Sequence, residues 1–331
     1  MSINSTQNIV THVKKKFPEK PGVYLFYDNI GNIIYIGKSV NLRKRVSGYF
    51  HKSNMERQKK TKILVTSICK VEYYETFNDF LALLIEDKLI KKYFPFYNVR
   101  QKKYKKYRYL HLTNGLYPTL KIINSTRKIR NKIIFGPFKG KFFINSLINI
   151  IQKYFKLRLC YETNPLTKCL YHDLDYCNAP CIMNIMPLEY TAIVNKVVDF
   201  LCGNNEYIIT MLEKKLNYHV THTEFENAHE TKSLIEFCKN FADKQKFFYR
   251  FKYGKLKIFE YDDTVPFYVF DKGRLELNTG KVNNKIIESN NGLFYFDNEL
   301  FKDSRVLLDR ADIVYNWLTR NKNSCRHIFE N

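Results

Sequence analysis

Two β-forming runs separated by five turn-forming residues constrain the fold of this chain more than any other feature. Residues 22–27 (GVYLFY) and 33–37 (IIYIG) are rich in aromatic and β-branched side chains, and residues 28–32 (DNIGN) between them have turn chemistry. A connection this short favours an antiparallel hairpin. We therefore expect a small antiparallel sheet near the N-terminus.

Helix signals flank this hairpin and give the first domain its class. Asn41 is placed to cap a helix that runs through Tyr49, and residues 71–76 (VEYYET) read as a third strand. Asn78 or Asp79 then begins a helix, and Pro95 limits it. The predicted class is mixed α/β (α+β), with a small antiparallel sheet flanked by helices in residues 1–105.

The rest of the chain divides by pattern into four further segments. We predict a β extension over 106–150, a cysteine-rich helical module over 151–203, a helical hairpin over 204–240 and a small β-rich C-terminal α/β region over 241–331. Aromatic alternation from Phe247 to about Phe296 predicts strands in the last segment, and a final helix is expected over 304–320.

Positive charge is concentrated in the N-terminal half of the chain. Residues 1–150 hold 30 Lys and Arg against 8 Asp and Glu, whereas the remainder has 25 against 24. A Lys-rich overall composition would spread the excess evenly. A one-sided excess is typical of a polyanion-binding part, because each neutralised phosphate releases condensed counterions. Nucleic acid is therefore the expected partner.

No membrane or secretion signal is recognised. No stretch approaches the roughly 20 apolar residues that a membrane helix needs, and the first residues lack the apolar core of a signal peptide. A cytoplasmic, nucleoid-associated protein of bacterial type without a membrane partner is expected.

A set of polar residues around the hairpin has the chemistry of phosphodiester hydrolysis. Tyr24 and Tyr35 lie on adjacent predicted strands and can project to one face, while Glu86 lies in an apolar helical run. A single carboxylate suits one hydrated Mg²⁺ or Mn²⁺, and Arg45 offers a guanidinium fork for phosphate. A tyrosine serves as a base only when cations lower its pKa from about 10; Lys38 and the metal are the candidates beside Tyr35.

Order and spacing of these residues resemble a known family. The runs PGVYLFYDNIGNIIYIGKSVNLRKRVSGYF and LLIEDKLIKKYFPFYNVR resemble the GIY-YIG nuclease domain of the UvrC/Cho excision-repair family. The resemblance implies Glu86 as metal ligand, Tyr35 as general base, and supporting roles for Tyr24, Lys38, Arg45, Tyr49 and Asn98. One departure is Leu81, where the family often has a second glutamate that is not the metal ligand. Expected DNA contacts are Lys38, Arg43, Lys44, Arg45, Lys91, Lys92, Arg100, Lys102 and Lys103.

Four of the eight cysteines fall within 22 residues, namely Cys160, Cys169, Cys177 and Cys181. Four thiols at one place suit Zn²⁺ or an iron–sulfur cluster, and their spacing does not separate the two; scattered buried thiols are the remaining alternative. The neighbouring motifs FGPF (135–138), LRLC (157–160), KCLY (168–171) and CNAPC (177–181) extend the family resemblance, which implies a [4Fe–4S] cluster.

The resemblance also sets the expected function and its rivals. Residues 205–236 loosely resemble the hairpin through which UvrC binds UvrB, although an ordinary amphipathic helix pair fits equally well. After residue 240 the resemblance is expected to end, so the plan is that of the short Cho form, which makes one incision 3′ to a lesion in damaged double-stranded DNA. The alternatives are a lesion-independent homing or restriction-type nuclease and a non-catalytic repair scaffold.

Overall fold

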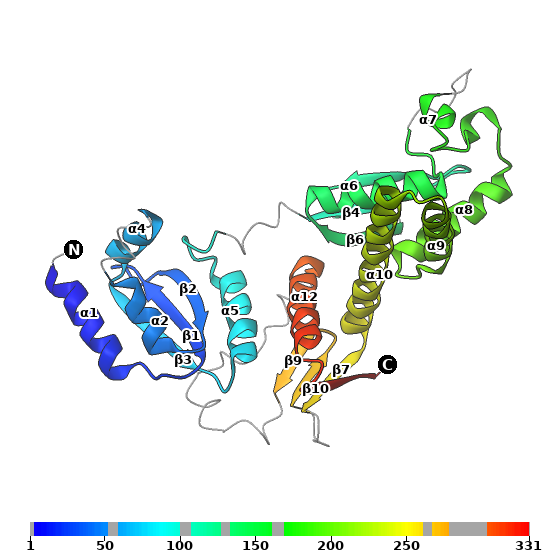
Figure 1. Cartoon of the computed structure of the whole chain (residues 1–331). Coiled ribbons are helices and arrows are strands. Elements are labelled where there is room, and N and C mark those ends of the chain that lie inside the picture. The colour runs from blue at the N-terminus through cyan, green and yellow to red at the C-terminus, as the bar shows by residue number, and fades with distance from the viewer. Residues whose placement is uncertain are drawn as a thin grey trace. The chain divides into compact units, whose positions relative to one another are not determined.

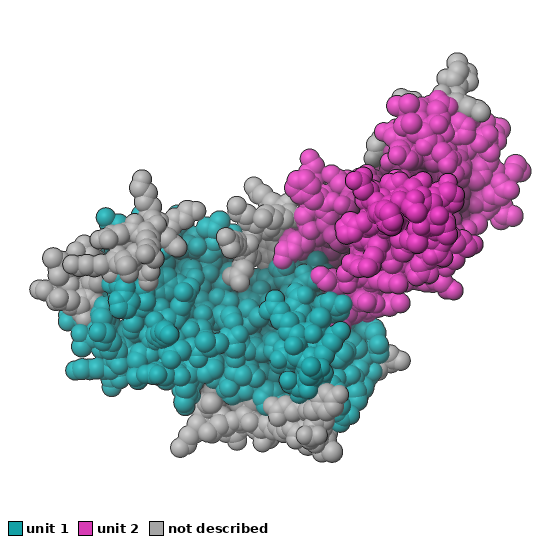
Figure 2. Space-filling model, viewed as in Figure 1, with its two compact units in different colours: residues 1–103, 250–331 teal, residues 104–249 magenta. Residues whose placement is uncertain are grey.

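The computed structural model describes residues 3–51, 59–99, 107–126, 133–160, 169–260, 267–277 and 303–330. These residues form two compact units (Figures 1 and 2). Unit 1 is discontinuous and combines residues 1–103 with 250–331, whereas unit 2 comprises residues 104–249. The N-terminal and C-terminal segments of the chain thus belong to one unit. The linear order of the predicted segments did not indicate this.

The N-terminal part of unit 1 is built on a three-stranded antiparallel sheet of order β2-β1-β3, as predicted. Its elements are α1 (Ile3–Lys16), β1 (Gly22–Tyr27), β2 (Ile33–Ser39), α2 (Leu42–Tyr49), α4 (Lys59–Ser67), β3 (Lys70–Glu75) and α5 (Asp79–Tyr93). Asn41 caps α2 and Asn78 caps α5, each by accepting a main-chain N–H from three residues on.

Helices cover both faces of this sheet. On one face, Tyr24 and Phe26 of β1 pack with side chains of α1, α2 and α4 in a single core. On the other face, α5 packs along β1 and β2. This helix is apolar on most of its surface, and ten of its fifteen residues are buried. The layered arrangement leaves β2 as an edge strand.

The C-terminal part of unit 1 is a four-stranded sheet of order β10-β7-β8-β9 with one helix. Its elements are β7 (Lys255–Glu260), β8 (Tyr268–Asp271), β9 (Arg274–Leu277), α12 (Ser304–Arg320) and β10 (Cys325–Glu330). The predicted final helix is confirmed. The predicted start of the strands at Phe247 is wrong, because Phe247, Phe248 and Phe251 are buried at helical spacing and belong to a helix that continues to Tyr253.

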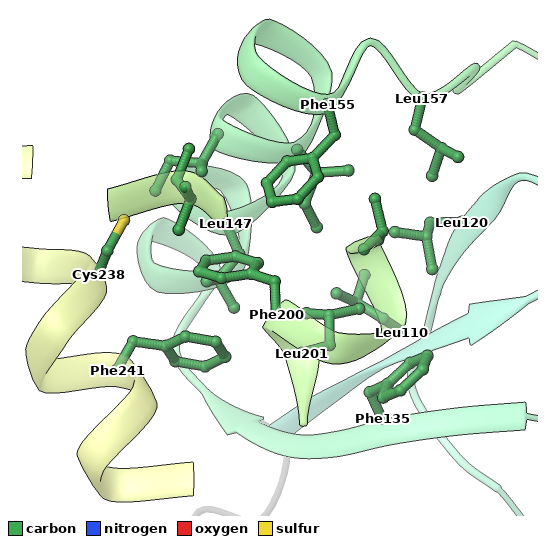
Figure 3. Close-up of a cluster of buried hydrophobic side chains, with 14 of the residues drawn as sticks. Leu110, Leu120, Phe135, Leu147, Phe155, Leu157, Phe200, Leu201, Cys238 and Phe241 are labelled. Carbon is green, nitrogen blue, oxygen red and sulfur yellow. The ribbon is translucent and has the colours of Figure 1, made fainter. Parts of the chain in front are cut away.

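Unit 2 combines the predicted β extension with helices. Its sheet has the order β5-β4-β6. Its elements are β4 (Tyr107–Leu112), β5 (Leu120–Ile123), β6 (Ile133–Lys139), α6 (Lys141–Ile150), the π-helix η2 (Ile151–Phe155), α7 (Leu170–Asp173), the 3₁₀ turn η3 (Pro180–Ile182), α8 (Pro187–Leu201), α9 (Glu206–Thr221) and most of α10 (Phe225–Tyr253). The last four residues of α10 belong to unit 1. Sheet and helix side chains share one core, in which Phe135, Phe155, Phe200 and Phe241 meet (Figure 3).

Within the described residues, no helix is long and apolar enough to cross a membrane.

Candidate active site

The two tyrosines of the hairpin lie on one face of the sheet, as predicted. Tyr24 pairs with Gly37 and Phe26 pairs with Tyr35 across the strands, so the two tyrosines are diagonal neighbours with ring centroids 6.1 Å apart. Gly37 leaves room for this arrangement, because a Cβ atom there would lie 2.4 Å from the Tyr24 hydroxyl oxygen. The glycine of the second triplet is therefore needed by the tyrosine of the first.

Tyr49 of α2 joins the two hydroxyl groups into one cluster. Its hydroxyl is 2.9 Å from that of Tyr24 and donates to that of Tyr35 at 3.3 Å. Tyr24 is 1% exposed, and burial together with Tyr49 and Tyr35 raises its pKa well above the ordinary value. Tyr24 is therefore a hydrogen-bonding and packing group, whereas Tyr35 is only partly buried and faces the cleft described below.

Arg45 is the cation that acts on this cluster. Its guanidinium lies 5.2 Å from the centre of the Tyr49 ring, and its charge opposes the burial that raises the pKa of Tyr24. The pKa of Tyr35 is raised by burial, by Tyr49 and by Glu86, and Arg45 lowers it. Lys38 was expected to lower this pKa, but its ammonium group forms an ion pair with Asp79.

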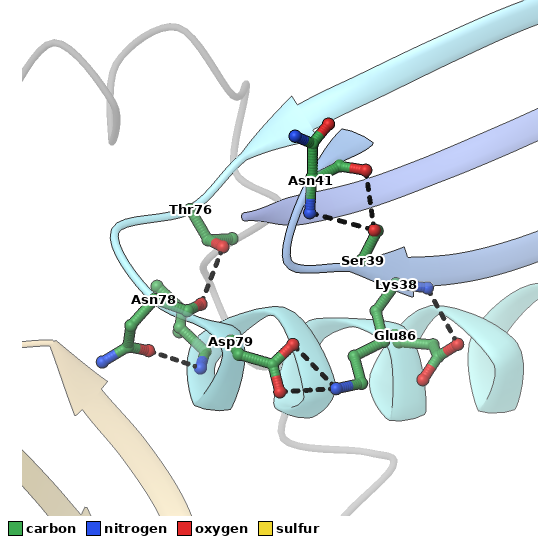
Figure 4. A network of polar contacts seen from close by, with 8 residues as sticks. Lys38, Ser39, Asn41, Thr76, Asn78, Asp79 and Glu86 are labelled. Carbon is green, nitrogen blue, oxygen red and sulfur yellow. Dashed lines mark hydrogen bonds and ion pairs between the residues drawn. The ribbon is translucent and has the colours of Figure 1, made fainter. Parts of the chain in front are cut away.

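Glu86 lies beside the end of β2 (Figure 4). The main-chain N–H of Lys38 donates to Glu86 Oε1 at 3.0 Å, while the Lys38 ammonium donates to Asp79 Oδ1 at 2.7 Å. Burial raises the pKa of Glu86 to about 7, although Lys38 opposes this effect. The pairing role of Asp79 was missed from the sequence; its position seven residues before Glu86, on the same helix face, is the signal that could have revealed it.

Asn98 holds the free edge of β2. Its Oδ1 accepts the Ile36 N–H at 2.9 Å, and its Nδ2 donates to the Ile36 carbonyl oxygen at 2.8 Å. The side chain is 8% exposed. It thus replaces the strand neighbour that an edge strand lacks.

An open cleft of about 1270 Å³ adjoins these groups. Tyr35, Lys44, Arg45 and Tyr49 contribute polar atoms to its wall, and Ile63, Phe96 and Val99 contribute apolar surface. Glu86 is only partly buried. Tyr35 and Arg45 line the cleft, and Glu86 contributes to the raised pKa of Tyr35. A single carboxylate, an arginine and a tyrosine hydroxyl match the needs of phosphodiester hydrolysis.

The basic residues expected to contact DNA have different environments. Lys44, Arg45 and Lys92 are exposed. Arg43 is a structural residue that donates to the Phe17 carbonyl oxygen at 2.7 Å and to Glu19 at 2.8 Å.

Lys91 was expected to contact DNA, and the structure shows that this prediction is wrong. Its side chain is 1% exposed and forms ion pairs with Asp87 and Asp309, so it is not available to a phosphate. Arg100, Lys102 and Lys103 lie outside the described residues.

The four cysteines of the predicted cluster lie in unit 2. Cys177 is buried, and burial raises its pKa to about 11, with further contributions from the other three thiols, Cys160, Cys169 and Cys181. Among the described residues, no group of three or more His, Cys, Asp or Glu side chains is arranged to hold a metal ion.

The fold and the site define the class of this protein. A three-stranded antiparallel sheet carries the GVY and YIG triplets as neighbouring strands, and a packed helix brings one glutamate to the end of the second triplet. This is a GIY-YIG domain. The predicted α/β class and small flanked sheet are confirmed.

Comparison with known proteins narrows the class. Residues 20–99 match the model of the UvrC-like GIY-YIG domain, and residues 107–200 match that of the UvrC/Cho excinuclease middle domain. The UvrABC system protein C of Pseudoalteromonas translucida is 36% identical over 70% of this chain and 38% of its own length. That of Streptococcus agalactiae is 33% identical over 89% of this chain and 48% of its own length.

Among solved structures, the magnesium-bound GIY-YIG endonuclease domain of Thermotoga maritima UvrC is 33% identical over 28% of this chain and 98% of that domain, with a TM-score of 0.25. The chain belongs to the UvrC/Cho-like GIY-YIG proteins. It spans less than half the length of the curated relatives named above. The Streptococcus alignment must extend beyond residue 240, so the expected end of the resemblance there is wrong.

Proposed function

We propose that this chain is a metal-dependent endonuclease of nucleotide excision repair that makes a single incision, 3′ to the lesion, in damaged double-stranded DNA. The observation that carries the proposal is that Tyr35 and Arg45 line one open cleft, while Glu86 accepts the Lys38 N–H at the end of β2 and contributes to the raised pKa of Tyr35. Membership of the UvrC/Cho-like proteins supports excision repair as the setting.

Glu86 fits the role of ligand for one divalent cation. It is a partly buried carboxylate, and burial raises its pKa to about 7, so a cation that binds it relieves an unfavourable charge. Mg²⁺ commonly takes one or two protein carboxylates and keeps several waters. A Mg²⁺ or Mn²⁺ ion held by Glu86 would polarise the phosphate and offset charge at the leaving oxygen.

The protein's own groups supply the remaining chemistry. Tyr35 accepts the proton of the attacking water when its own hydroxyl is deprotonated, and Arg45 favours that form against the burial that raises the pKa of Tyr35. Arg45 also binds the phosphoryl oxygens. Tyr49 hydrogen-bonds Tyr24 and Tyr35 and so fixes the hydroxyl that reacts. Lys38 holds Glu86 through its main-chain N–H and α5 through Asp79.

DNA contacts are assigned to the exposed basic residues near the cleft. Lys44 and Arg45 lie on α2 at the cleft wall, and Lys92 lies near the end of α5. The family resemblance adds Arg100, Lys102 and Lys103, which lie outside the described residues, to the proposed DNA-binding set. It also adds Lys38 and Arg43, whose side chains would have to exchange Asp79 and Glu19 for phosphate. Buried Lys91 is left out of the set. Because these cations would release counterions from the phosphates, the affinity for DNA should fall as the salt concentration rises.

We further propose a [4Fe–4S] cluster on Cys160, Cys169, Cys177 and Cys181, with Zn²⁺ as the alternative occupant. The donor set supports this assignment, since it consists of four soft thiols within 22 residues of sequence. Residues 204–240, which contain α9 and the first half of α10, are proposed to bind a UvrB-type damage-loading protein. A pull-down with the full chain tests this, and failure of the purified proteins to bind would reject this partner.

The deciding experiment is a nicking assay on a duplex that carries one bulky adduct and is end-labelled on each strand. It uses Mg²⁺ or Mn²⁺, with and without UvrB-type partners. One metal-dependent cut 3′ to the adduct supports the proposal. Cutting that ignores the adduct would indicate a lesion-independent nuclease, and an absence of cutting under every condition would indicate a scaffold.

A further inference from the structure

Helix α5 presents two adjacent faces with different partners. Asp79 and Glu86, seven residues apart, both bind Lys38 on the sheet side. Phe80 and Asp87, each one residue further along, face the C-terminal part of unit 1. Seven residues are about two helical turns, so Asp79 and Glu86 share one face of α5, and Phe80 and Asp87 share the adjacent face. The helix that carries the proposed metal ligand is therefore held from both sides.

Aromatic packing joins the first turn of α5 to the C-terminal part. The rings of Phe80 and Trp317 of α12 are stacked, with centroids 4.2 Å apart and planes inclined by 18°. Tyr268 of β8 meets Phe80 edge to face at 5.0 Å. Phe80 is only 2% exposed, so these contacts exclude water and fix the rotation of the helix at this point.

A hydrogen bond also reaches the cap of α5. The Tyr268 hydroxyl donates to Asn78 Oδ1 at 2.8 Å. The same oxygen accepts the Leu81 N–H at 2.9 Å as the N-cap of the helix. The start of α5 is therefore bonded to a strand 190 residues away in sequence.

Buried charges join the second half of α5 to α12. The Lys91 ammonium lies 2.7 Å from Asp87 Oδ1 and 3.1 Å from Asp309 Oδ2, and the three side chains are 1%, 5% and 14% exposed. Arg310 is fully buried. Burial lowers the pKa of its guanidinium, and the charge of Asp87 opposes this effect. Buried ions are tolerated only where their partners are held in place, so this cluster resists displacement of either helix.

We infer that residues 250–331 are a positioning part of the nuclease site: Tyr268, Asp309 and Trp317 hold α5 so that Glu86 stays against the Lys38 N–H. The inference rests on the proposed function, because Glu86 is the proposed metal ligand. It assigns a role to a region that neither domain model covers. A purely stabilising role is the rival explanation. It predicts that substitutions loosen the whole sheet, whereas a positioning role predicts changes confined to the Lys38 N–H and the Mg²⁺ site.

The test uses the full chain and two readouts, neither of which is nuclease activity. Amide hydrogen exchange at Lys38 reports whether Glu86 is in place, since that N–H donates to its carboxylate. Calorimetric titration with Mg²⁺ alone reports the metal site. The variants are Asp309→Asn, which leaves Lys91 paired with Asp87, and Trp317→Leu, which removes the stack on Phe80.

Two matched controls lie on the same helix. Trp317→Phe keeps an aromatic ring over Phe80, and Asn316→Ala changes an exposed position. We expect Asp309→Asn and Trp317→Leu to speed exchange at Lys38 and weaken Mg²⁺ binding by about tenfold each, the size typical of residues that orient a metal ligand. The amides of the β1–β3 pairing should stay protected, and both controls should match the natural protein.

Unchanged exchange at Lys38 and unchanged Mg²⁺ affinity in folded Asp309→Asn and Trp317→Leu would overturn the inference. General acceleration of exchange over the whole sheet would equally overturn it, because that is the result of a purely stabilising role. Where Trp317→Leu fails to fold, Asp309→Asn decides. If the natural protein binds no Mg²⁺, the proposed function fails, while exchange at Lys38 still decides whether α12 positions Glu86.

Discussion

The main-chain N–H of Lys38 donates to Glu86 Oε1 at 3.0 Å, which joins the end of the edge strand β2 to the middle of α5. A single hydrogen bond thus connects the YIG triplet to the carboxylate. A glutamine can accept the same bond through its side-chain oxygen, so charge and position can be separated at this residue.

Glu86→Gln is predicted to reduce nicking by at least about 100-fold while DNA affinity stays within twofold, because the metal ligand is lost but the fold and basic surface are kept. Nicking rate and filter-binding affinity check this. Glu226→Gln, at an exposed position of unit 2, is the matched control. Retained nicking in Glu86→Gln would remove this residue from the mechanism.

The stability of Glu86→Gln should depend on pH less than that of the natural protein. Burial raises the folded-state pKa of Glu86 from 4.5 to about 7, so stability from its protonated form is complete below about 4.5 and is lost as pH rises through about 7. The free energy of unfolding of Glu86→Gln, relative to that of the natural protein, should therefore rise between pH 5 and pH 8 by at most about 3 kcal/mol.

Thermal unfolding at these two pH values measures the effect, and Mg²⁺ supplies a second arm. At pH 8 the ion should raise the melting temperature of the natural protein but not that of Glu86→Gln, because ligand binding stabilises only a protein that binds it. A difference between the two proteins that stays constant with pH would show that Glu86 titrates normally.

The rate of nicking should rise with pH above neutrality if Tyr35 is the base. Its pKa is raised by burial and by Glu86, and Arg45 lowers it, so the reactive, deprotonated form grows as pH increases. Arg45→Met should reduce the rate by about 100-fold and move the rise to higher pH. Arg45→Lys keeps the charge and should lie between. A rate at saturating Mg²⁺ that does not change between about pH 7.5 and 9.5 would exclude Tyr35 as the base.

Local patterns were enough to predict the small sheet and the two tyrosines on one of its faces. The hairpin, the Asn41 cap and the placement of Tyr24 and Tyr35 on one face depend on residues close in sequence. Glu86 and Asn98 were assigned through order and spacing, which the family resemblance supplied. The structure brings both to β2, at Lys38 and Ile36 respectively.

Features that depend on distant contacts were not predicted. Lys91 resembles a surface lysine in sequence, but α12 buries it beside Asp309, more than 200 residues away. The aromatic run after Phe247 alternates like a strand, yet its burial follows the helical period of α10. In each case the tertiary partner decides the environment, and local propensity carries no information about that partner.

Gly37→Ala should destabilise the protein and reduce nicking together. The new Cβ atom would lie 2.4 Å from the Tyr24 hydroxyl oxygen, so the ring must move and break its bond to Tyr49. Overpacking of this kind costs about 1–3 kcal/mol, which thermal or denaturant unfolding measures. Gly48→Ala on α2 is the matched control, because a Cβ there meets no atom within 4 Å. Equal stability of the two variants would contradict the close approach of Tyr24 to Gly37.

The cysteine module gives a prediction that separates iron–sulfur from zinc. Protein purified without oxygen should contain about four iron atoms per chain and absorb near 400 nm, since four thiolates suit a [4Fe–4S] cluster. Cys177→Ser removes the most buried of the four thiols and should lose the iron and the absorbance. Cys202→Ser, at an exposed cysteine elsewhere in unit 2, should keep both. Stoichiometric zinc without iron would assign the site to Zn²⁺. If the purified protein contains neither metal, the four residues are ordinary cysteines of the module.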